Sequence, residues 1–516
     1  MTTDRPTPTV TSGGPERGAG PIDLDALTLA DIRAGSFRGR PVTVLGFARS
    51  GIALARFFAD TGASVTVYDG RPASELADAM AALDGRPIRL LAGPAIDPET
   101  AWAGASLVAT SPSINPDFPT TEPRLRGALR ALVAARGSGD SSVPALVSEA
   151  DLFLRLCPAP TVGVTGTKGK TTTSSLIAAV LAADPAHRSV LGGNIGVPLV
   201  ERLLDLGPDD RVVIELSELQ LPTLSRGTTV AVYTNVTSDH LDRHGSLEGY
   251  RAAKRRLAEL VDPAGALVLN GDDPVVAAYA SIGRARTVVY RLSTPLSGGL
   301  GVLDGWIVDD EAGPIMPVDE LSIPGRHNVS NALAAVATGL LFGVDRSAIR
   351  SAAAAFTGVE HRLEPVEVID GVRFVNDSQG TQPDAVIAAL RAFDPPIVLI
   401  AGGRDKGVDL TELAAVAAER ASAAVVIGES GPLLAKLFRA AGLATIEAAA
   451  TLDEAVRTAD ALARQALENE GATTGTVLLS PAAASFDMFV DYAARGRAFK
   501  EAVGRLAAER RRRGDR

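Results

Sequence analysis

A glycine- and threonine-rich turn at residues 163–173 carries the strongest chemical signal in the sequence. It reads Gly163-Val-Thr-Gly-Thr-Lys-Gly-Lys-Thr-Thr-Thr173 and stands between a strand-like run and a helix-like segment. Backbone N–H groups of such a turn, aided by the helix N-terminus, bind phosphate oxygens. In this pattern Lys170 reaches the terminal phosphates, and the Thr171 hydroxyl binds Mg²⁺. The sequence therefore predicts a nucleoside triphosphate site, although Val164 stands where the general pattern has glycine.

Acidic, histidine and lysine side chains follow this turn. Glu215 ends the apolar run RVVIE, and a second run, VAVYTNV, is followed by Asp239, His240 and Asp242. Carboxylates at strand ends beside a nucleotide commonly bind Mg²⁺. Taken singly, each group is compatible with an ordinary structural role, and Lys254 in the helical stretch GYRAAKRRL is compatible with a surface lysine. Beside a phosphate loop, the Asp/His/Glu group as a whole favours a metal site.

The elements that must position these groups alternate between strand and helix. From Arg40 the sequence predicts a strand, a glycine turn, a helix and a second strand that ends at Asp69, which is a βαβ pattern. After Ser148 short apolar strands again alternate with helices, and the alternation restarts after His361. The sequence therefore predicts an α/β protein of three units, with a largely parallel, doubly wound sheet at its centre.

The first glycine turn is ambiguous on its own. It reads Gly46-Phe-Ala-Arg-Ser-Gly51 and has Ala48 where the dinucleotide-binding fingerprint has its central glycine. The pattern G-x-A-x-x-G is weak evidence and leaves an NAD-dependent oxidoreductase open. That class of enzyme accounts for the first unit only and leaves the phosphate loop unused.

Length, charge and cysteine content exclude several classes of protein. With 516 residues the chain is long enough for two to four domains. Its 51 basic and 61 acidic residues give a formal net charge of −10, which argues against a nucleic-acid partner or a membrane-surface protein. Cys157 is the only cysteine, so an internal disulfide and a cysteine-rich zinc site are excluded. Because no apolar run is long enough to span a membrane and no secretion signal is recognisable, we expect a cytoplasmic protein without membrane insertion.

Eight motifs occur in the order in which the Mur ligases carry them. They are TGTKGKTTT, LGGNIGVPL, ELSELQL, TNVTSDHLDRHGS, GRHNVSNALAA, EHRLEPV, NDSQGT and LLSPAAASFDMF. On these motifs the chain resembles the Mur ligase family, and the resemblance runs from about Val42 to about Phe499. Within the family it is most similar to the branch that adds D-glutamate to UDP-N-acetylmuramoyl-L-alanine in peptidoglycan synthesis.

The resemblance implies three α/β domains and a monomer. An N-terminal Rossmann-like domain for the UDP-sugar is expected at residues 22–149, a central phosphate-loop ATPase with a mainly parallel sheet at 150–360, and a C-terminal Rossmann-like ligase domain at 361–516. Residues 1–21 are rich in Thr, Pro and Gly and are expected to form a disordered tail.

The resemblance also implies a reaction. The γ-phosphate of ATP is transferred to the acceptor carboxylate, and the amino group of glutamate attacks the resulting acyl phosphate, so that ADP and phosphate leave. A carboxylate is a poor electrophile, and phosphorylation gives it a leaving group. Transfer between anions needs concentrated positive charge, for which Lys170, Arg362 and two Mg²⁺ ions are available in this picture.

By resemblance, the site residues fall into several groups. Those that act at the reacting groups are Lys170, His240, Lys254 and Arg362. Those that bind ATP are Thr165, Gly166, Thr167, Lys168, Gly169, Lys170, Thr171, Thr172, Asn328, Asn331, Arg362 and Asp377. The Mg²⁺ ligands are Thr171, Glu215, His240 and a carbamylated Lys254. The UDP-sugar contacts are Arg49, Ser50, Asp69, Arg71, Asn194 and Ser217, and the amino-acid contacts are Thr381, Lys406, Ser485 and Tyr492.

The sequence departs from the D-glutamate branch at three places. Gln379 stands in NDSQGT where that branch has lysine, ELSELQL replaces ELSSFQL, and Tyr492 stands where phenylalanine is common. These changes leave the identity or stereochemistry of the amino acid open, so addition of L-glutamate stays an alternative hypothesis. A diaminopimelate-adding enzyme is disfavoured because the DNPR-type motif of that subfamily is absent.

Two further functions are open at this point. Folylpolyglutamate synthase shares the central ATPase but lacks an N-terminal UDP-binding unit, whereas here residues 22–149 precede the phosphate loop. A regulatory Mur-like protein that only binds nucleotide predicts the loss of at least one reactive residue. The residues in question, all of which are present, are Lys170, Glu215, His240 and Lys254.

Overall fold

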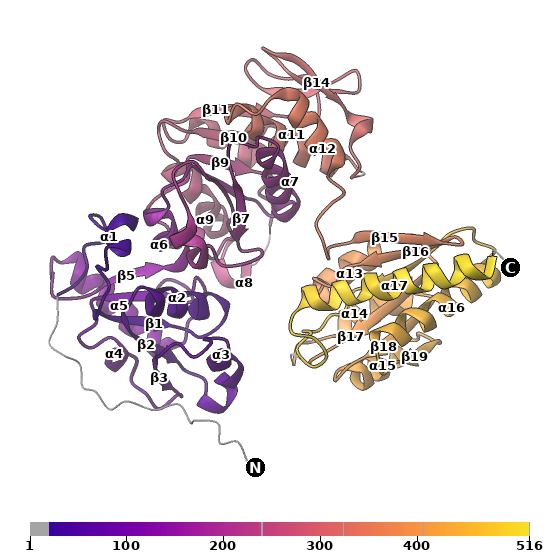
Figure 1. Cartoon of the computed structure of the whole chain (residues 1–516), viewed down its shortest axis with the longest axis horizontal. Helices are drawn as coiled ribbons and strands as arrows, with labels where there is room; N and C mark the ends of the chain where they lie inside the picture. Colours follow the sequence, from indigo (N-terminus) through magenta and orange to yellow (C-terminus); the bar gives the residue numbers. More distant parts are fainter. Residues whose placement is uncertain (1–19, 239–240, 324, 406, 515–516) are drawn as a thin grey trace. The chain divides into compact units, whose positions relative to one another are not determined.

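The computed structural model describes residues 20–238, 241–323, 325–405 and 407–514. The chain divides into two compact units, one that ends at Phe356 and one that begins at Thr357. The first unit contains two β-sheets and the second contains one, and helices pack on all three sheets (Figure 1).

The first sheet has five parallel strands in the order β3-β2-β1-β4-β5. The strands are β1 (Pro41–Leu45), β2 (Ser64–Asp69), β3 (Arg89–Ala92), β4 (Leu107–Thr110) and β5 (Ala145–Ser148). The helices are α1 (Leu29–Arg33), α2 (Arg49–Asp60), α3 (Ala77–Ala81), α4 (Pro98–Ala101), α5 (Pro123–Gly137) and α6 (Glu149–Leu156). Because β2 and β4 flank β1, the turn after β1 lies at the point where strand order reverses, which is where such sheets bind ligands.

The second sheet has nine strands in the order β14-β13-β12-β11-β10-β9-β6-β8-β7. The strands are β6 (Thr161–Thr165), β7 (Ser189–Gly193), β8 (Arg211–Glu215), β9 (Val230–Tyr233), β10 (Ala266–Asn270), β11 (Arg286–Tyr290), β12 (Leu300–Leu303), β13 (Trp306–Asp309) and β14 (Gly313–Pro317). The helices are α7 (Lys170–Ala182), α8 (Leu241–His244), α9 (Leu247–Leu260), α10 (Pro274–Ala277), α11 (Arg326–Leu341) and α12 (Arg346–Ala355). The neighbouring strands β12, β11, β10, β9, β6, β8 and β7 are parallel to one another. The strands β12, β13 and β14 form an antiparallel edge of the same sheet.

The single sheet of the second unit has the order β15-β16-β20-β17-β18-β19. The strands are β15 (Glu364–Ile369), β16 (Val372–Asn376), β17 (Ile397–Gly402), β18 (Ala423–Ile427), β19 (Ile446–Ala448) and β20 (Gly475–Leu479). The helices are α13 (Pro383–Arg391), α14 (Thr411–Arg420), α15 (Gly431–Ala440), α16 (Leu452–Glu470) and α17 (Tyr492–Gly514). Only β15 runs antiparallel to its neighbour.

The central strands of the second and third sheets are fully buried because both faces of each sheet are covered. Every residue of β6, β8, β9, β10, β17, β18 and β20 is buried. The prediction of an α/β fold with mainly parallel sheets in three modules is confirmed. The domain boundaries at 149/150 and 360/361 stay predictions, and the tail predicted for residues 1–21 lies almost wholly outside the described residues.

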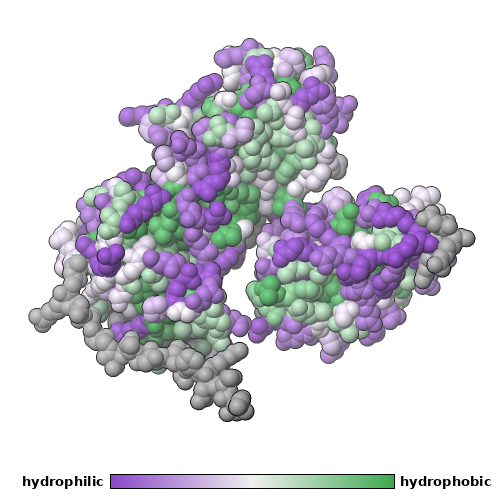
Figure 2. All heavy atoms as spheres, in the orientation of Figure 1, coloured by the Kyte–Doolittle hydropathy of each residue, from purple (hydrophilic) through white to green (hydrophobic). Residues whose placement is uncertain are grey.

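Polar and apolar side chains are mixed over the visible face of each unit (Figure 2). Among the described residues, no helix is both long enough and apolar enough to cross a membrane.

Candidate active site

The phosphate loop between β6 and α7 depends on two glycines. Gly166 has a φ of +154°, and a Cβ there would lie 1.9 Å from the Oγ1 atom of Thr234. Gly169 has a φ of +85° and caps α7, where a Cβ would lie 2.9 Å from the Oδ1 atom of Asn331. Other residues rarely adopt these φ values and would clash with the neighbours. The loop can therefore pass close to its surroundings and begin α7 as a phosphate-binding turn requires.

The Nζ atoms of two lysines converge on one carbonyl oxygen of this loop. Lys170 Nζ donates to the carbonyl oxygens of Gly166 and Thr167, both at 3.0 Å. Lys254 Nζ donates to the Gly166 carbonyl oxygen at 3.0 Å and to Thr165 Oγ1 at 3.2 Å. The Lys254 side chain comes from α9 and is 0 % exposed. The interpretation of Lys254 as an ordinary surface lysine is therefore wrong, since its side chain is buried against the loop.

Glu215 lies beside the loop because β8 pairs with β6, with Glu215 opposite Val164. The carboxylate is 1 % exposed. Its Oε1 atom accepts a hydrogen bond from Asn194 Nδ2 at 2.8 Å, whereas its Oε2 atom is buried without a hydrogen-bond partner in the described structure. An unpaired buried carboxylate oxygen is costly, and a divalent cation would satisfy it. The donor set at this strand end thus fits Mg²⁺, with the buried Thr171 hydroxyl at the start of α7 as a further oxygen donor.

The sequence analysis did not identify the residues that hold the phosphate loop from the β9 side. Asn235 accepts from the Lys168 N–H at 2.9 Å through Oδ1 and donates to the Lys168 carbonyl oxygen at 3.0 Å through Nδ2. Thr234 Oγ1 donates to the same carbonyl oxygen at 2.6 Å. Both residues belong to the motif TNVTSDH, in which the acidic and histidine side chains alone had been singled out. These hydrogen bonds hold the backbone of the phosphate loop at Lys168.

Tyr250 is a second contact that the sequence did not reveal. Its hydroxyl lies 2.9 Å from Thr167 Oγ1, and the Lys254 Nζ atom lies 5.5 Å from the centre of its ring. Tyr250 stands four residues before Lys254 on α9, so the two side chains lie on the same helix face. The tyrosine thus links the loop to the buried lysine.

Asn328 and Asn331 are predicted by the family resemblance to bind ATP through its adenine. Both lie in the first turns of α11, beside α7. Asn331 Oδ1 accepts from Thr173 Oγ1 at 3.1 Å, and Asn331 Nδ2 donates to Asn328 Oδ1 at 3.1 Å. The structure therefore places Asn331 against the helix that follows the phosphate loop. The adenine role of both residues stays a prediction.

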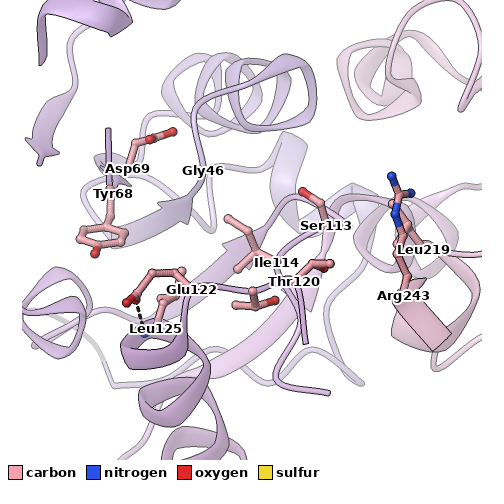
Figure 3. Close-up of a pocket in the computed structure, with 12 residues that line it drawn as sticks. Gly46, Tyr68, Asp69, Ser113, Ile114, Thr120, Glu122, Leu125, Leu219 and Arg243 are labelled. Atoms are coloured by element: carbon pink, nitrogen blue, oxygen red, sulfur yellow. Dashed lines mark hydrogen bonds between the residues drawn. The ribbon is translucent and has the colours of Figure 1, made fainter. Parts of the chain in front are cut away.

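A cavity of about 390 Å³ lies at the carboxyl ends of β1, β2 and β4 in the first unit (Figure 3). Its lining residues are Gly46, Tyr68, Asp69, Gly70, Ser113, Ile114, Thr120, Thr121, Glu122, Leu125, Leu219 and Arg243. Of the predicted UDP-sugar residues, only Asp69 lines this cavity. The segment from Thr120 to Leu125, which enters α5, had no recognisable motif and was missed. Leu219 lies in the segment after β8 and Arg243 lies on α8, so the cavity is lined by residues that follow strands of both sheets of this unit.

Asp69 is held as an ionised carboxylate at the cavity. It accepts from the Phe47 N–H at 2.8 Å, from the Arg71 N–H at 2.9 Å and from the Arg71 guanidinium at 2.8 Å. Burial raises the pKa of Asp69, but these hydrogen bonds outweigh it and hold the pKa below its ordinary value. In this structure Arg71 therefore donates hydrogen bonds to Asp69 and stabilises its charge. The contact of Arg71 with the UDP-sugar stays a prediction.

The other predicted UDP-sugar residues do not line this cavity. Arg49 donates to the carbonyl oxygens of Gly193 at 3.2 Å and Asn194 at 3.0 Å, which links α2 to the loop after β7. Ser217 is buried and donates to Gln220 Oε1 at 3.0 Å. Ser50 is half-buried in the first turn of α2.

Part of the unusual motif ELSELQL also lies at the cavity. Glu218 is buried, and its carboxylate lies 3.6 Å from the Nη1 atom of Arg243, which lines the cavity together with Leu219. The replacements at Glu218 and Leu219 therefore concern the cavity of the first unit. They give no direct reason to expect a substrate amino acid other than D-glutamate.

In the second unit, the predicted residues gather at one edge of the sheet. The strands β16, β20 and β17 are neighbours, so the loops that follow their carboxyl ends lie together. These loops carry Thr381, which is half-buried, and Ser485, which is buried. Tyr492 begins α17, and its carbonyl oxygen accepts from Ser378 Oγ at 2.7 Å. Gln379 lies in the same loop as Thr381, and its Oε1 atom is buried without a hydrogen-bond partner among the residues that the structure describes.

Asp377 and Arg362 lie at the start of this unit. Asp377 accepts from Ser480 Oγ at 2.6 Å and from the Leu363 N–H at 3.1 Å, and burial raises its pKa to about 6. The exposed Arg362 stands between two residues with positive φ, His361 at +65° and Leu363 at +44°. The backbone is thus strained on both sides of Arg362, which is a common feature of functional positions.

Three of the residues singled out in the sequence lie outside the described part of the chain, namely Asp239, His240 and Lys406. Their placement as metal or amino-acid ligands therefore stays a prediction.

Known proteins resemble the chain over most of its length. Residues 164–339 match the Mur ligase middle domain, and residues 361–483 match the Mur ligase glutamate ligase domain. The UDP-N-acetylmuramoylalanine–D-glutamate ligase of Pelotomaculum thermopropionicum is 40% identical over 475 residues, which cover 90% of this chain and 98% of that protein. The ligase of the same name from Symbiobacterium thermophilum is 39% identical over 471 residues, with 90% and 98% covered.

A solved structure has the same fold. The UDP-N-acetylmuramate–alanine ligase MurC of Thermotoga maritima superposes with a TM-score of 0.51 at 20% identity, over 90% of this chain and 99% of that one. Together with the two domain matches and the relatives at 40% and 39% identity, this similarity gives a single assignment. The chain belongs to the Mur ligase family.

Proposed function

We propose that the protein is an ATP-dependent ligase that adds D-glutamate to UDP-N-acetylmuramoyl-L-alanine in peptidoglycan synthesis. The observation that carries this proposal is the 40% identity, over 90% of the chain, to a relative named for that activity. A phosphate loop with two converging lysines and an unpaired carboxylate oxygen supports it independently. The cavity of the first unit offers a place for the uridine nucleotide part of the acceptor.

The reaction follows from the acceptor's chemistry. The terminal carboxylate of the acceptor attacks the γ-phosphorus of ATP, the bond to the β-phosphate oxygen breaks, and ADP leaves. The amino group of glutamate then attacks the acyl phosphate carbon, loses a proton and displaces phosphate, so that one amide bond forms for each ATP cleaved. The ammonium group of Lys170 offsets negative charge at the phosphates, and Arg362 does so at the acyl phosphate.

Two Mg²⁺ ions would be held by Thr171 and Glu215 at the nucleotide and by His240 and Lys254 near the acyl phosphate. When bound, the ions would neutralise phosphate oxygens and lower the barrier to their displacement. We propose that Lys254 is carbamylated, since an uncharged buried lysine can capture CO₂ and so become an anionic oxygen ligand. The complete burial of Lys254 beside the Gly166 carbonyl oxygen supports this assignment.

The residues that bind the substrates follow the family pattern. ATP is bound by Thr165, Gly166, Thr167, Lys168, Gly169, Lys170, Thr171, Thr172, Asn328, Asn331, Arg362 and Asp377. The UDP-sugar is bound by Arg49, Ser50, Asp69, Arg71, Asn194 and Ser217, and glutamate by Thr381, Lys406, Ser485 and Tyr492. The domains are 22–149, 150–360 and 361–516, and the protein acts as a monomer. The division of the chain after Phe356 and the domain matches at 164–339 and 361–483 support these boundaries.

Addition of L-glutamate is the second candidate, favoured by one observation. Gln379 replaces a lysine of the D-glutamate pattern, and its unpaired Oε1 atom lies in the loop that carries Thr381. The test is phosphate release with UDP-N-acetylmuramoyl-L-alanine, Mg·ATP and either enantiomer of glutamate. Release with D-glutamate alone supports the proposal, and release with L-glutamate alone overturns it in favour of the second candidate.

A further inference from the structure

Arg495 is a buried arginine in the first turn of α17 that the reaction does not require. Its side chain is 1 % exposed. The guanidinium donates five hydrogen bonds to oxygen atoms of three residues. The contacts are Nε to Ser378 Oγ at 3.0 Å, Nη2 to the Ser378 carbonyl oxygen at 2.9 Å, Nη2 and Nη1 to the Ala483 carbonyl oxygen at 3.3 Å, and Nη1 to the Ala484 carbonyl oxygen at 3.4 Å.

All five hydrogen bonds of this guanidinium end on neutral oxygen atoms, and the carboxylate of Asp487 attracts its charge. Within the described part of the chain, none of its hydrogen bonds ends on a carboxylate. Burial lowers the pKa of Arg495 to about 10, so the group stays charged at neutral pH. A buried cation is tolerated only where surrounding dipoles are fixed toward it. The carbonyl groups around Arg495 must therefore keep their positions.

These carbonyl groups belong to two loops that carry proposed glutamate contacts. Ser378 lies three residues before Thr381 in the loop after β16, and Ala484 directly precedes Ser485 in the loop after β20. The Ser378 hydroxyl also donates to the Tyr492 carbonyl oxygen at 2.7 Å, so the start of α17 is joined to the same cluster.

Backbone contacts reinforce this junction. The Ala482 N–H donates to the Gly380 carbonyl oxygen at 2.9 Å, and the Arg404 N–H donates to the Ala484 carbonyl oxygen at 2.8 Å. A Cβ at Gly403 would lie 3.1 Å from the Arg495 Nη1 atom, so the loop after β17 also passes close to the guanidinium. The ends of β16, β17 and β20 therefore meet around one side chain.

We propose that Arg495 is a positioning residue for the amino-acid substrate, because it sets the spacing of the three segments that bear Thr381, Ser485 and Tyr492. The inference rests on the proposed function and adds to it a residue that does not itself touch glutamate. Arginine suits this task because its planar group offers five donors in fixed directions, whereas lysine offers a single nitrogen.

The test compares Arg495→Met, Arg495→Lys and Ser378→Ala with wild type. Arg497→Lys is the matched control, since Arg497 lies on the same helix and is exposed. Steady-state phosphate release gives KM for D-glutamate, KM for ATP and kcat. Hydrogen exchange of residues 377–382 and 480–485 reports loop order without any substrate, and thermal unfolding shows which variants fold.

The expected result is a selective effect. KM for glutamate rises by about tenfold or more in Arg495→Met and by less in Arg495→Lys, while KM for ATP changes by less than about twofold. In the Arg495 variants, the amide hydrogens of residues 377–382 and 480–485 both exchange faster than in wild type. In Ser378→Ala, which removes one hydroxyl and is expected to fold, KM for glutamate rises and the loop after β16 loses protection. The Arg497→Lys control behaves as wild type.

Two other outcomes overturn the inference. Folded Arg495 variants with unchanged KM for glutamate would exclude a positioning role, and equal increases of both KM values would show a general structural role instead. Failure of the proposed function is distinguished from both, because the wild-type enzyme itself would then be inactive with glutamate while the exchange experiment still reports on the loops.

Discussion

At the residue scale, two lysine side chains of the candidate site meet at one carbonyl oxygen. Lys170 reaches Gly166 from the start of α7, and Lys254 reaches it from α9, each at 3.0 Å. At the neighbouring strand end, the buried Oε2 atom of Glu215 has no hydrogen-bond partner within the described ranges of the chain. Positive charge and an unsatisfied anion thus lie beside the same turn, which is the arrangement that a metal-bound nucleotide needs.

The carbamylation proposal predicts partial rescue of a truncated lysine. Lys254→Ala should lower kcat by on the order of a hundredfold, because an anionic ligand near the acyl phosphate is lost. Acetate or formate should restore part of the activity by occupying the space left by the buried side chain, whereas chloride at equal ionic strength should not. Arg255→Ala on the exposed side of α9 is the control. Wild-type activity of Lys254→Ala would disprove the ligand role.

Asp377 predicts a pH dependence of stability. Its pKa in the folded chain is about 6, above its ordinary value of 3.8, because the carboxyl is buried. The folded state therefore holds this proton more tightly than the unfolded state. The corresponding stabilisation is fully present below pH 3.8 and is lost as the pH rises through 6.

The loss is measured against Asp377→Asn, which cannot titrate. Relative to that variant, the free energy of unfolding of the wild-type chain should fall by up to about 3 kcal/mol between the two pKa values. Urea denaturation at a series of pH values gives this difference. A constant difference across the range would contradict the raised pKa.

At the element scale, strand ends place the reactive groups and glycines shape the turns. The sequence alone predicted the position of the phosphate loop, the strand-end position of Glu215 and the alternation of strands and helices, because each depends on a local pattern. Asn235 and Arg495 could not be predicted, since their partners Lys168 and Ser378 lie 67 and 117 residues away in the chain. The cavity segment that enters α5 was missed because only pairing of β4 with β1 brings it beside Asp69.

The phosphate loop's backbone predicts the effect of a single methyl group. In Gly166→Ala the new Cβ would lie 1.9 Å from Thr234 Oγ1 at a φ of +154°, so the loop must shift. ATP affinity should fall at least about tenfold while the helical content of the protein is retained. Gly207→Ala, where nothing lies within 4 Å, is the matched control. Equal affinities of the two variants for ATP, measured by calorimetry, would show that the loop does not bind the nucleotide.

At the scale of the whole molecule, three sheets carry three parts of one proposed reaction. The first has the cavity proposed for the nucleotide-linked sugar, the second has the phosphate loop, and the third has the loops proposed for glutamate. An NAD-dependent oxidoreductase would account for the first sheet only and would leave the phosphate loop unused. The relatives named as D-glutamate ligases match along 90% of the chain, which includes all three.

The most direct measurement of this account is the mass and stereochemistry of the product. The enzyme is incubated with UDP-N-acetylmuramoyl-L-alanine, Mg·ATP and an equal mixture of isotope-labelled D-glutamate and unlabelled L-glutamate, and the UDP-linked product is analysed by mass spectrometry. The account predicts one glutamyl residue per acceptor, carrying the D-isomer's label, with one phosphate released for each amide formed. Unlabelled product, or no product alongside ATP cleavage, would contradict it.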